Sequence, residues 1–235
     1  MQLLLLSNST MPRTPYFSWS KPYVKQFLET KAVKSVVFIP FAAVTFSMDE
    51  YAKITQDAFA SIGFNLQSIH STKQSEELIK QAECIVIGGG NTFALLHRLH
   101  ESGLMTLIQE KVAQQTPYIG WSAGANLACP TIRTTNDMPI VQPPSFQALN
   151  FIPFQINPHY HELSLPGQGG ETRIERLNEF ITFNPQVAVL GLPEGMLLER
   201  ETNKLLLKGK GEAKWFRHGQ STQSLMEGDV SFLLQ

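Results

Sequence analysis

A serine flanked by two glycines lies in the stretch of this 235-residue chain that is best suited to chemistry. Gly120, Ser122 and Gly124 form a G-x-S-x-G pattern, which follows the strand-forming residues Tyr118 and Ile119 and precedes small residues that tolerate a helix. A serine at a sharp strand-to-helix turn projects its hydroxyl from the carboxyl edge of a sheet, and the next helix directs N–H groups to the same point. The pattern therefore predicts a nucleophile beside an oxyanion site.

A run of three glycines, residues 88–90, predicts a second backbone feature at the same edge. Glycines at the end of a strand let the backbone approach a ligand closely, and Asn91 after them can cap a helix. We expect the oxyanion donors to be the N–H groups of Ala123 and of Gly89 or Gly90. On this basis Gly90→Val should cripple turnover while the fold is retained. A dinucleotide-binding turn is disfavoured because G-x-G-x-x-G is absent.

These two turns lie within a regular alternation of apolar strand-like segments and amphipathic segments. The alternation over the first 130 residues predicts an α/β fold with a doubly wound, mostly parallel sheet, flanking helices and C-terminal antiparallel hairpins. Ligands bind such sheets at the carboxyl ends of the strands. The expected strands are residues 3–6, 34–40, 65–70, 84–88, 118–121, 187–191, 196–200, 204–208, 214–217 and 230–234, and the helices include 75–81, 105–114 and 171–180.

One helix start is clear from its capping residues. Ser47 and Glu50 have the spacing of a capping box, in which each side chain accepts from the other residue's backbone N–H. The pattern after it predicts that Ile54, Ala58 and Ile62 share the buried face of this helix.

Composition limits the classes of partner and site. A net charge of −1, with 17% charged residues and no basic stripe, makes nucleic acid an unexpected partner. The six histidines are scattered, so neither a metal nor another cofactor is expected. The apolar run 3–6 is too short for a signal peptide or membrane span, and Cys84 and Cys129 look like reduced core residues. We expect one catalytic domain over residues 1–235, in the cytoplasm, as a monomer or small homo-oligomer.

Several longer segments resemble a known family. They are residues 118–141, 85–93, 155–159 (Q-I-N-P-H), 170–173 (G-E-T-R) and 191–195 (G-L-P-E-G). Together they are similar to the peptidase E family, the aspartyl dipeptidases among serine peptidases, whose fold is similar to that of class I glutamine amidotransferases. The resemblance runs from the opening strand to about residue 195. It implies metal-free hydrolysis of small peptides with an N-terminal aspartate, chiefly Asp-Xaa dipeptides.

A serine hydroxyl needs a base and a group that orients the base. His159 is the candidate base, because the N-P-H motif places it at a rigid strand end, and His161 is its rival. Two acids match the family motifs. Glu194, which follows a buried strand and is braced by proline and glycine, is the preferred partner of His159, and Asp137 is a supporting or alternative member of the triad with Ser122.

Recognition of a substrate aspartate calls for a cation, and arginine matches a carboxylate bidentately. Arg173 in the G-E-T-R segment is the first candidate, with Arg133 and Arg176 behind it, and Asn91 is a further substrate-binding candidate. The loop at residues 139–144 or the one at residues 160–170 could limit substrate length.

Three alternatives stay open. An α/β-hydrolase esterase shares the serine elbow, although its histidine would come last in the chain. A cyanophycinase-like hydrolase would share the serine and the aspartate preference and act on a polymer. A non-catalytic, amidotransferase-like binding module would not depend on Ser122.

Overall fold

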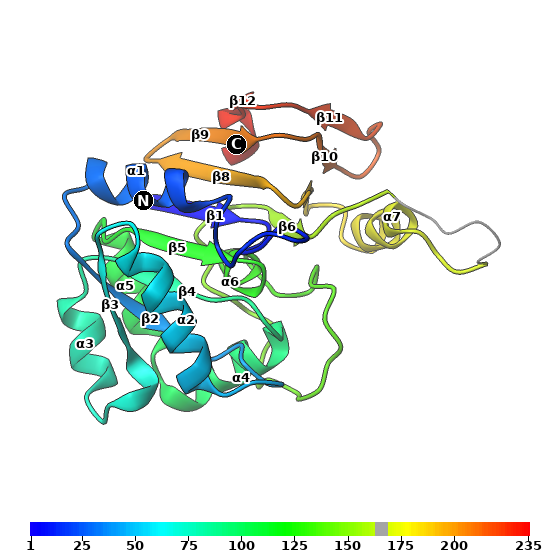
Figure 1. Cartoon of the computed structure of the whole chain (residues 1–235). Coiled ribbons are helices and arrows are strands. Elements are labelled where there is room, and N and C mark those ends of the chain that lie inside the picture. Colours follow the sequence, from blue (N-terminus) through cyan, green and yellow to red (C-terminus); the bar gives the residue numbers. More distant parts are fainter. Residues whose placement is uncertain (163–168) are drawn as a thin grey trace.

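A computed structural model describes residues 1–162 and 169–235, and its largest element is an eight-stranded sheet (Figure 1). Five parallel strands form its core, in the order β1 (Gln2–Leu6), β5 (Tyr118–Trp121), β4 (Ile85–Ile87), β2 (Ser35–Ile39) and β3 (Asn65–Ser68). An antiparallel edge pairs with β1 and consists of β8 (Met196–Glu201), β9 (Lys204–Gly209) and β12 (Gly228–Asp229). The predicted α/β class with an antiparallel C-terminal portion is confirmed.

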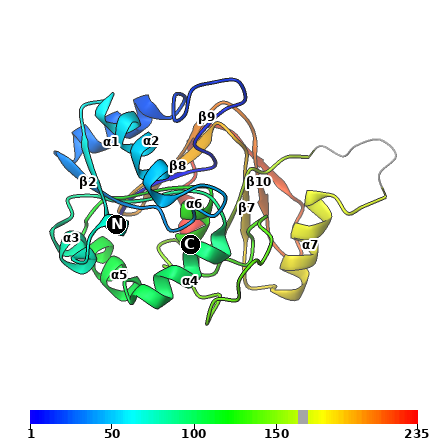
Figure 2. The same cartoon turned by 60° about the horizontal axis from the view of Figure 1, so that its bottom comes forward.

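Helices cover both faces of this sheet (Figure 2). Alternating side chains of β1 show the division, since Leu4 and Leu6 pack on one side and Leu3 and Leu5 on the other. The first face carries α1 (Lys21–Thr30) and α2 (Met48–Ala60). The second carries α3 (Ser75–Gln81), α4 (Thr92–Ser102), α5 (Met105–Ala113) and α6 (Ala123–Leu127), and a 3₁₀ turn, η1 (Ile69–Ser71), follows β3. Within the two described ranges, no helix is both long and apolar enough to cross a bilayer.

A separate four-stranded sheet, which the sequence did not predict, stands beside the first. It has the order β11 (Gln223–Leu225), β10 (Ala213–Phe216), β7 (Val189–Leu192) and β6 (Gln155–Pro158), and α7 (Arg173–Phe183) packs on it through Leu177 and Ile181. The N-P-H motif indicated a strand end here, but the strand β6 itself was not predicted, because it buries the polar residues Gln155 and Asn157, which break the apolar pattern of a core strand.

Two predicted details are wrong. On α2 the capping box forms and Ala58 is buried as expected, but Ile54 is 45% exposed and the buried positions also include Tyr51 and Phe59. The face that meets the sheet is therefore rotated towards the aromatic residues.

Residues 230–234 do not form a strand. Asp229 accepts hydrogen bonds from the backbone and hydroxyl of Ser231, and this favours the 3₁₀ turn η2 (Ser231–Leu234).

A buried hydroxyl at the end of β1 joins the two sheets. Ser7 donates to the carbonyl of Leu192 at 2.8 Å and accepts from the backbone N–H of His159 at 2.8 Å. Next to it, the side-chain oxygen of Asn8 accepts from the N–H of Gly195 at 2.9 Å. Both residues thus fix the ends of β6 and β7 against the carboxyl end of β1.

We predict that Ser7→Ala destabilises the protein. The substitution leaves the partly buried N–H of His159 without its partner, at a cost of about 1–3 kcal/mol, and it removes one of the two hydrogen bonds to the Leu192 carbonyl, which keeps the one from the N–H of Tyr160. Urea unfolding followed by circular dichroism measures the change in the free energy of unfolding. The matched control is Ser9→Ala, because the Ser9 hydroxyl has only a 3.4 Å contact with Thr10. Equal stability of the two variants would contradict the role given to Ser7.

Candidate active site

The backbone at Ser122 is strained, and its glycine neighbours make this conformation possible. Ser122 lies between β5 and α6 with φ 53° and ψ −112°, a combination that L-residues rarely adopt. A Cβ atom on Gly120 would lie 2.4 Å from the carbonyl oxygen of Gly124, and one on Gly124 would lie 2.2 Å from the carbonyl oxygen of Ile87. Only glycine fits at either position, so the G-x-S-x-G pattern has a direct steric cause.

A continuous run of hydrogen bonds connects the serine to a carboxylate. His159 Nε2 lies 2.8 Å from Ser122 Oγ, and His159 Nδ1 lies 2.7 Å from Glu194 Oε1. The parallel pairing of β6 and β7 sets Pro158 opposite Leu192, so the residues that follow both strands meet at one edge. The side chains of His159 and Glu194 are 40% and 39% exposed, which leaves the ring accessible from solvent.

The second candidate acid lies elsewhere in the site. Asp137 Oδ2 accepts from the backbone N–H of Thr92 at 2.7 Å, from the Thr92 hydroxyl at 2.6 Å and from the Thr135 hydroxyl at 3.1 Å. Among the described side chains, the His159 ring hydrogen-bonds Ser122 and Glu194 and makes no hydrogen bond to Asp137. The rival base His161 is exposed and lines a different, shallow hollow with Glu162.

Backbone segments approach the serine from two sides. Ala123 is the first residue of α6, so its N–H has no acceptor within the helix. Gly89 comes so close that a Cβ atom there would lie 2.9 Å from the Cβ of Ser122. Gly90 has φ +132°, and a Cβ atom on it would lie 2.2 Å from the carbonyl oxygen of Ala42. Both glycines line the cavity in front of Ser122.

This geometry corrects one expectation. Gly90→Val would force a side chain against the Ala42 carbonyl in a backbone conformation that favours glycine. The loop must then move, so retention of the fold no longer follows. Loss of turnover in that variant would not separate an oxyanion role from a local collapse.

The three candidate arginines have different surroundings. Arg173 is half-buried at the start of α7, its guanidinium hydrogen-bonds the side-chain oxygen of Asn136, and burial lowers its pKa from the usual value, with a smaller contribution from Arg176. The guanidinium of Arg133 is 5.5 Å from the centre of the Phe180 ring. Arg176 is exposed, with a 3.8 Å ion pair to an acidic neighbour. Of the three, Arg173 is the most desolvated and the one tied to the loop of Asp137.

Asn91 is occupied by structural contacts. Its side-chain oxygen caps α4 by accepting from the N–H of Ala94 at 3.0 Å, and its amide donates to the carbonyl of Met138 at 2.9 Å. The loop of residues 139–144 continues from there, and Ile140 in it is exposed. The second loop proposed to limit substrate length, residues 160–170, falls partly outside the described residues.

The cavity in front of Ser122 has a volume of about 520 Å³ and is largely apolar. Among its lining residues, Trp121 Nε1 donates to the Tyr51 hydroxyl at 2.9 Å, and burial raises the pKa of Tyr51 well above its usual value. Within residues 1–162 and 169–235, no three His, Cys, Asp or Glu side chains gather to hold a metal ion. The lining residues are Asn8, Ser9, Thr10, Tyr16, Phe46, Tyr51, Ile54, Gly89, Gly90, Trp121, Ser122, Asp137 and His159.

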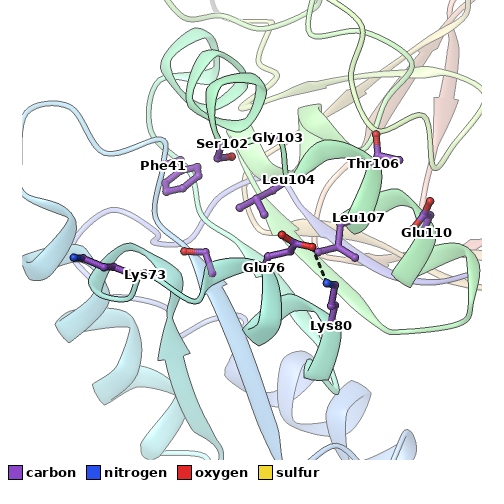
Figure 3. Close-up of a pocket in the computed structure, with 11 residues that line it drawn as sticks. Phe41, Lys73, Glu76, Lys80, Ser102, Gly103, Leu104, Thr106, Leu107 and Glu110 are labelled. Carbon is purple, nitrogen blue, oxygen red and sulfur yellow. Dashed lines mark ion pairs between the residues drawn. The ribbon is translucent and has the colours of Figure 1, made fainter.

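A larger hollow, about 630 Å³, lies between α3, α4 and α5 (Figure 3). Leu104 and Leu107 line it beside the exposed ion pair of Glu76 and Lys80, which are 2.7 Å apart. None of the candidate site residues lies in it. The candidate site is therefore assigned to the cavity at Ser122 by the residues that line it and not by its volume.

Buried amides that sequence reasoning missed hold the site together. Asn126 on α6 donates to the carbonyl of Ile156 at 2.8 Å and to the Thr134 hydroxyl at 3.1 Å, which ties the helix after the serine to the strand before the histidine. Asn157 donates to the carbonyl of Thr134 at 2.8 Å and to the side-chain oxygen of Asn136 at 2.6 Å. The signal available in the sequence was an asparagine within an otherwise small and apolar helix.

Comparison with known proteins identifies relatives over the whole chain. The model of Peptidase family S51 matches residues 3–208. Peptidase E of a Nostoc species is 48% identical over 235 residues, covering 100% of this chain and 97% of the relative. Peptidase E of Haemophilus influenzae is 49% identical over 196 residues, covering 83% of this chain and 90% of the relative.

Two solved structures share the fold. A protein assigned to peptidase E from Listeria monocytogenes matches with a TM-score of 0.66 and 25% identity, covering 89% of this chain and 98% of the other. A peptidase from an acI-B1 actinobacterium matches with a TM-score of 0.70 and 19% identity, covering 98% and 96%, which shows the fold alone. The resemblance recognised in the motifs is confirmed. The chain belongs to peptidase family S51 and is a peptide hydrolase.

Proposed function

We propose that this protein is a cytoplasmic serine dipeptidase that hydrolyses dipeptides with an N-terminal aspartate. The observation that carries the proposal is the unbroken run of hydrogen bonds from Ser122 through His159 to Glu194. Peptidase E is the name of the relatives that cover the whole chain, and this supports the same reaction class. Such a run converts a weakly nucleophilic hydroxyl into one that a neighbouring base can deprotonate.

In the proposed reaction, Ser122 Oγ attacks the carbonyl carbon of the first residue while His159 Nε2 takes its proton. The oxyanion that forms is stabilised by the N–H of Ala123 and by the glycine turn at Gly89 and Gly90. His159 then gives the proton to the leaving amine, and an acyl-enzyme remains on Ser122. Water attacks this ester with His159 again as base, and the released products are aspartate and the second residue.

Glu194 has the role of orienting the base. A carboxylate on Nδ1 holds the ring in the tautomer whose Nε2 can accept a proton, and it stabilises the imidazolium that forms. Asp137, with its hydrogen bonds to Thr92 and Thr135, is not needed for this task.

Ser122→Ala should abolish hydrolysis of Asp-Leu, with kcat reduced roughly 10⁴-fold or more, because only binding and oxyanion stabilisation remain. Release of leucine, measured by chromatography, reports the rate. A fluorophosphonate reagent should label the wild-type protein at Ser122 and leave the variant unlabelled. Residual activity within tenfold of wild type would refute Ser122 as the nucleophile.

Glu194→Gln should lower kcat for Asp-Leu by about 10²- to 10³-fold with little change in KM. The amide keeps a hydrogen bond to the ring but cannot stabilise an imidazolium, and the partial exposure of the pair weakens the effect below that of a buried carboxylate. Steady-state kinetics on the purified variant measures it. If kcat stays within twofold of wild type, another group orients His159.

Arg173→Met should reduce the preference for aspartate over leucine at the first position by about 10- to 100-fold. This factor corresponds to the free energy of one hydrogen bond between charged groups. The readout is the ratio of kcat/KM for Asp-Leu to that for Leu-Leu. Matched controls are Arg133→Met and Arg176→Met, whose guanidinium groups contact a phenylalanine ring and solvent. An unchanged ratio in Arg173→Met, or an equal change in a control, would remove Arg173 from this role.

A further inference from the structure

The carboxylate of Asp137 has two oxygens with different surroundings. Oδ2 accepts all three hydrogen bonds from Thr92 and Thr135, which hold the loop on the N-terminus of α4. Oδ1 accepts no hydrogen bond from any described residue, and Asp137 lines the same cavity as Ser122 and His159. One oxygen of this carboxylate is therefore anchored and the other is available to a ligand.

The charge of this cavity favours a cation at that position. Apart from the titratable ring of His159, Asp137 is the one side chain with a formal charge among the residues that line it. The side-chain oxygen of an asparagine could also accept the hydrogen bonds that anchor this loop to α4. These hydrogen bonds therefore do not require a negative charge. A substrate amine, protonated at neutral pH, is the cation that a peptidase would bring here.

We propose that Asp137 binds the α-ammonium group of the substrate's first residue, an inference that rests on the function proposed above. Asn136, next to Asp137, contacts the guanidinium of Arg173. In an N-terminal aspartate the ammonium is on Cα and the side-chain carboxylate is attached to the next carbon, Cβ, so Asp137 and the Arg173 that Asn136 holds can offer one opposite charge to each. The remaining, apolar part of the cavity, around Phe46 and Ile54, is left for the second residue.

This role predicts that cleavage requires a free amino terminus on the substrate. A peptide with residues before the aspartate has a neutral amide in place of the ammonium, and the amide would desolvate Asp137 without compensating its charge. Asp137 is thus a substrate-positioning residue that does not contact the catalytic histidine.

The test compares Asp-Leu with N-succinyl-leucine, which has the same carboxylate and scissile bond but lacks the amine. The wild-type protein should prefer Asp-Leu by about 10- to 100-fold in kcat/KM. Asp137→Asn keeps an oxygen that can accept from Thr92. Its kcat/KM should fall by this factor for Asp-Leu and change by less than about threefold for succinyl-leucine. The matched control is Thr135→Val, which removes one anchor but keeps the charge, so it should affect both substrates equally.

Two results would overturn the proposal. One is a wild-type protein that cleaves both substrates equally well, and the other is an Asp137→Asn variant that loses the same factor on both, as a merely structural residue would. Thermal unfolding shows whether the variant is folded, and Asp137→Ser replaces it if it is not. A wild-type protein that cleaves neither substrate would refute the proposed function itself, whereas equal losses on active protein would refute only the role of Asp137.

Discussion

The steric constraint at Ser122 determines where everything else in the site can be. A backbone with positive φ is tolerated at this residue because the flanking glycines leave no Cβ atom to collide with the carbonyls of Gly124 and Ile87. The tight contact between the turn and the end of β4 also brings the glycine run of residues 88–90 against the serine. The proposed nucleophile and oxyanion donors are therefore fixed by one packing arrangement, and neither needs a flexible side chain to be positioned.

The remaining groups of the proposed triad come from a different sheet, so the two sheets must be held in register. β6 and β7 end side by side, and this brings His159 and Glu194 together. The hydroxyl of Ser7 then joins these ends to β1, which is the neighbour of β5. Hydrogen bonds of this kind are directional, so they fix position more closely than apolar contacts can. The buried amide of Asn126 provides a second such connection, from α6 to β6.

Charge in the site is divided between separate tasks. Glu194 faces the histidine, whereas Asp137 is anchored to α4 and has an oxygen left over. Arg173 is partly desolvated, and burial lowers its pKa because the charged form loses hydration, with a smaller contribution from the positive charge of Arg176. The guanidinium of Arg173 and the carboxylate of Asp137 are therefore suited to a substrate whose first residue carries both a negative and a positive charge.

The sequence by itself determined the parallel core, the serine turn and the glycine run, because these depend on local sterics and on periodicity that are visible along the chain. It also indicated His159 and Glu194 as candidates through short motifs, and it left Asp137 as an alternative acid. Only the tertiary structure decided which carboxylate meets the ring, that β6 is a strand, and that Ser7 bridges two sheets. These outcomes depend on strand pairing and on hydrogen bonds between residues far apart in the chain, such as Ser7 and Leu192, which are 185 positions apart, and no local pattern encodes them.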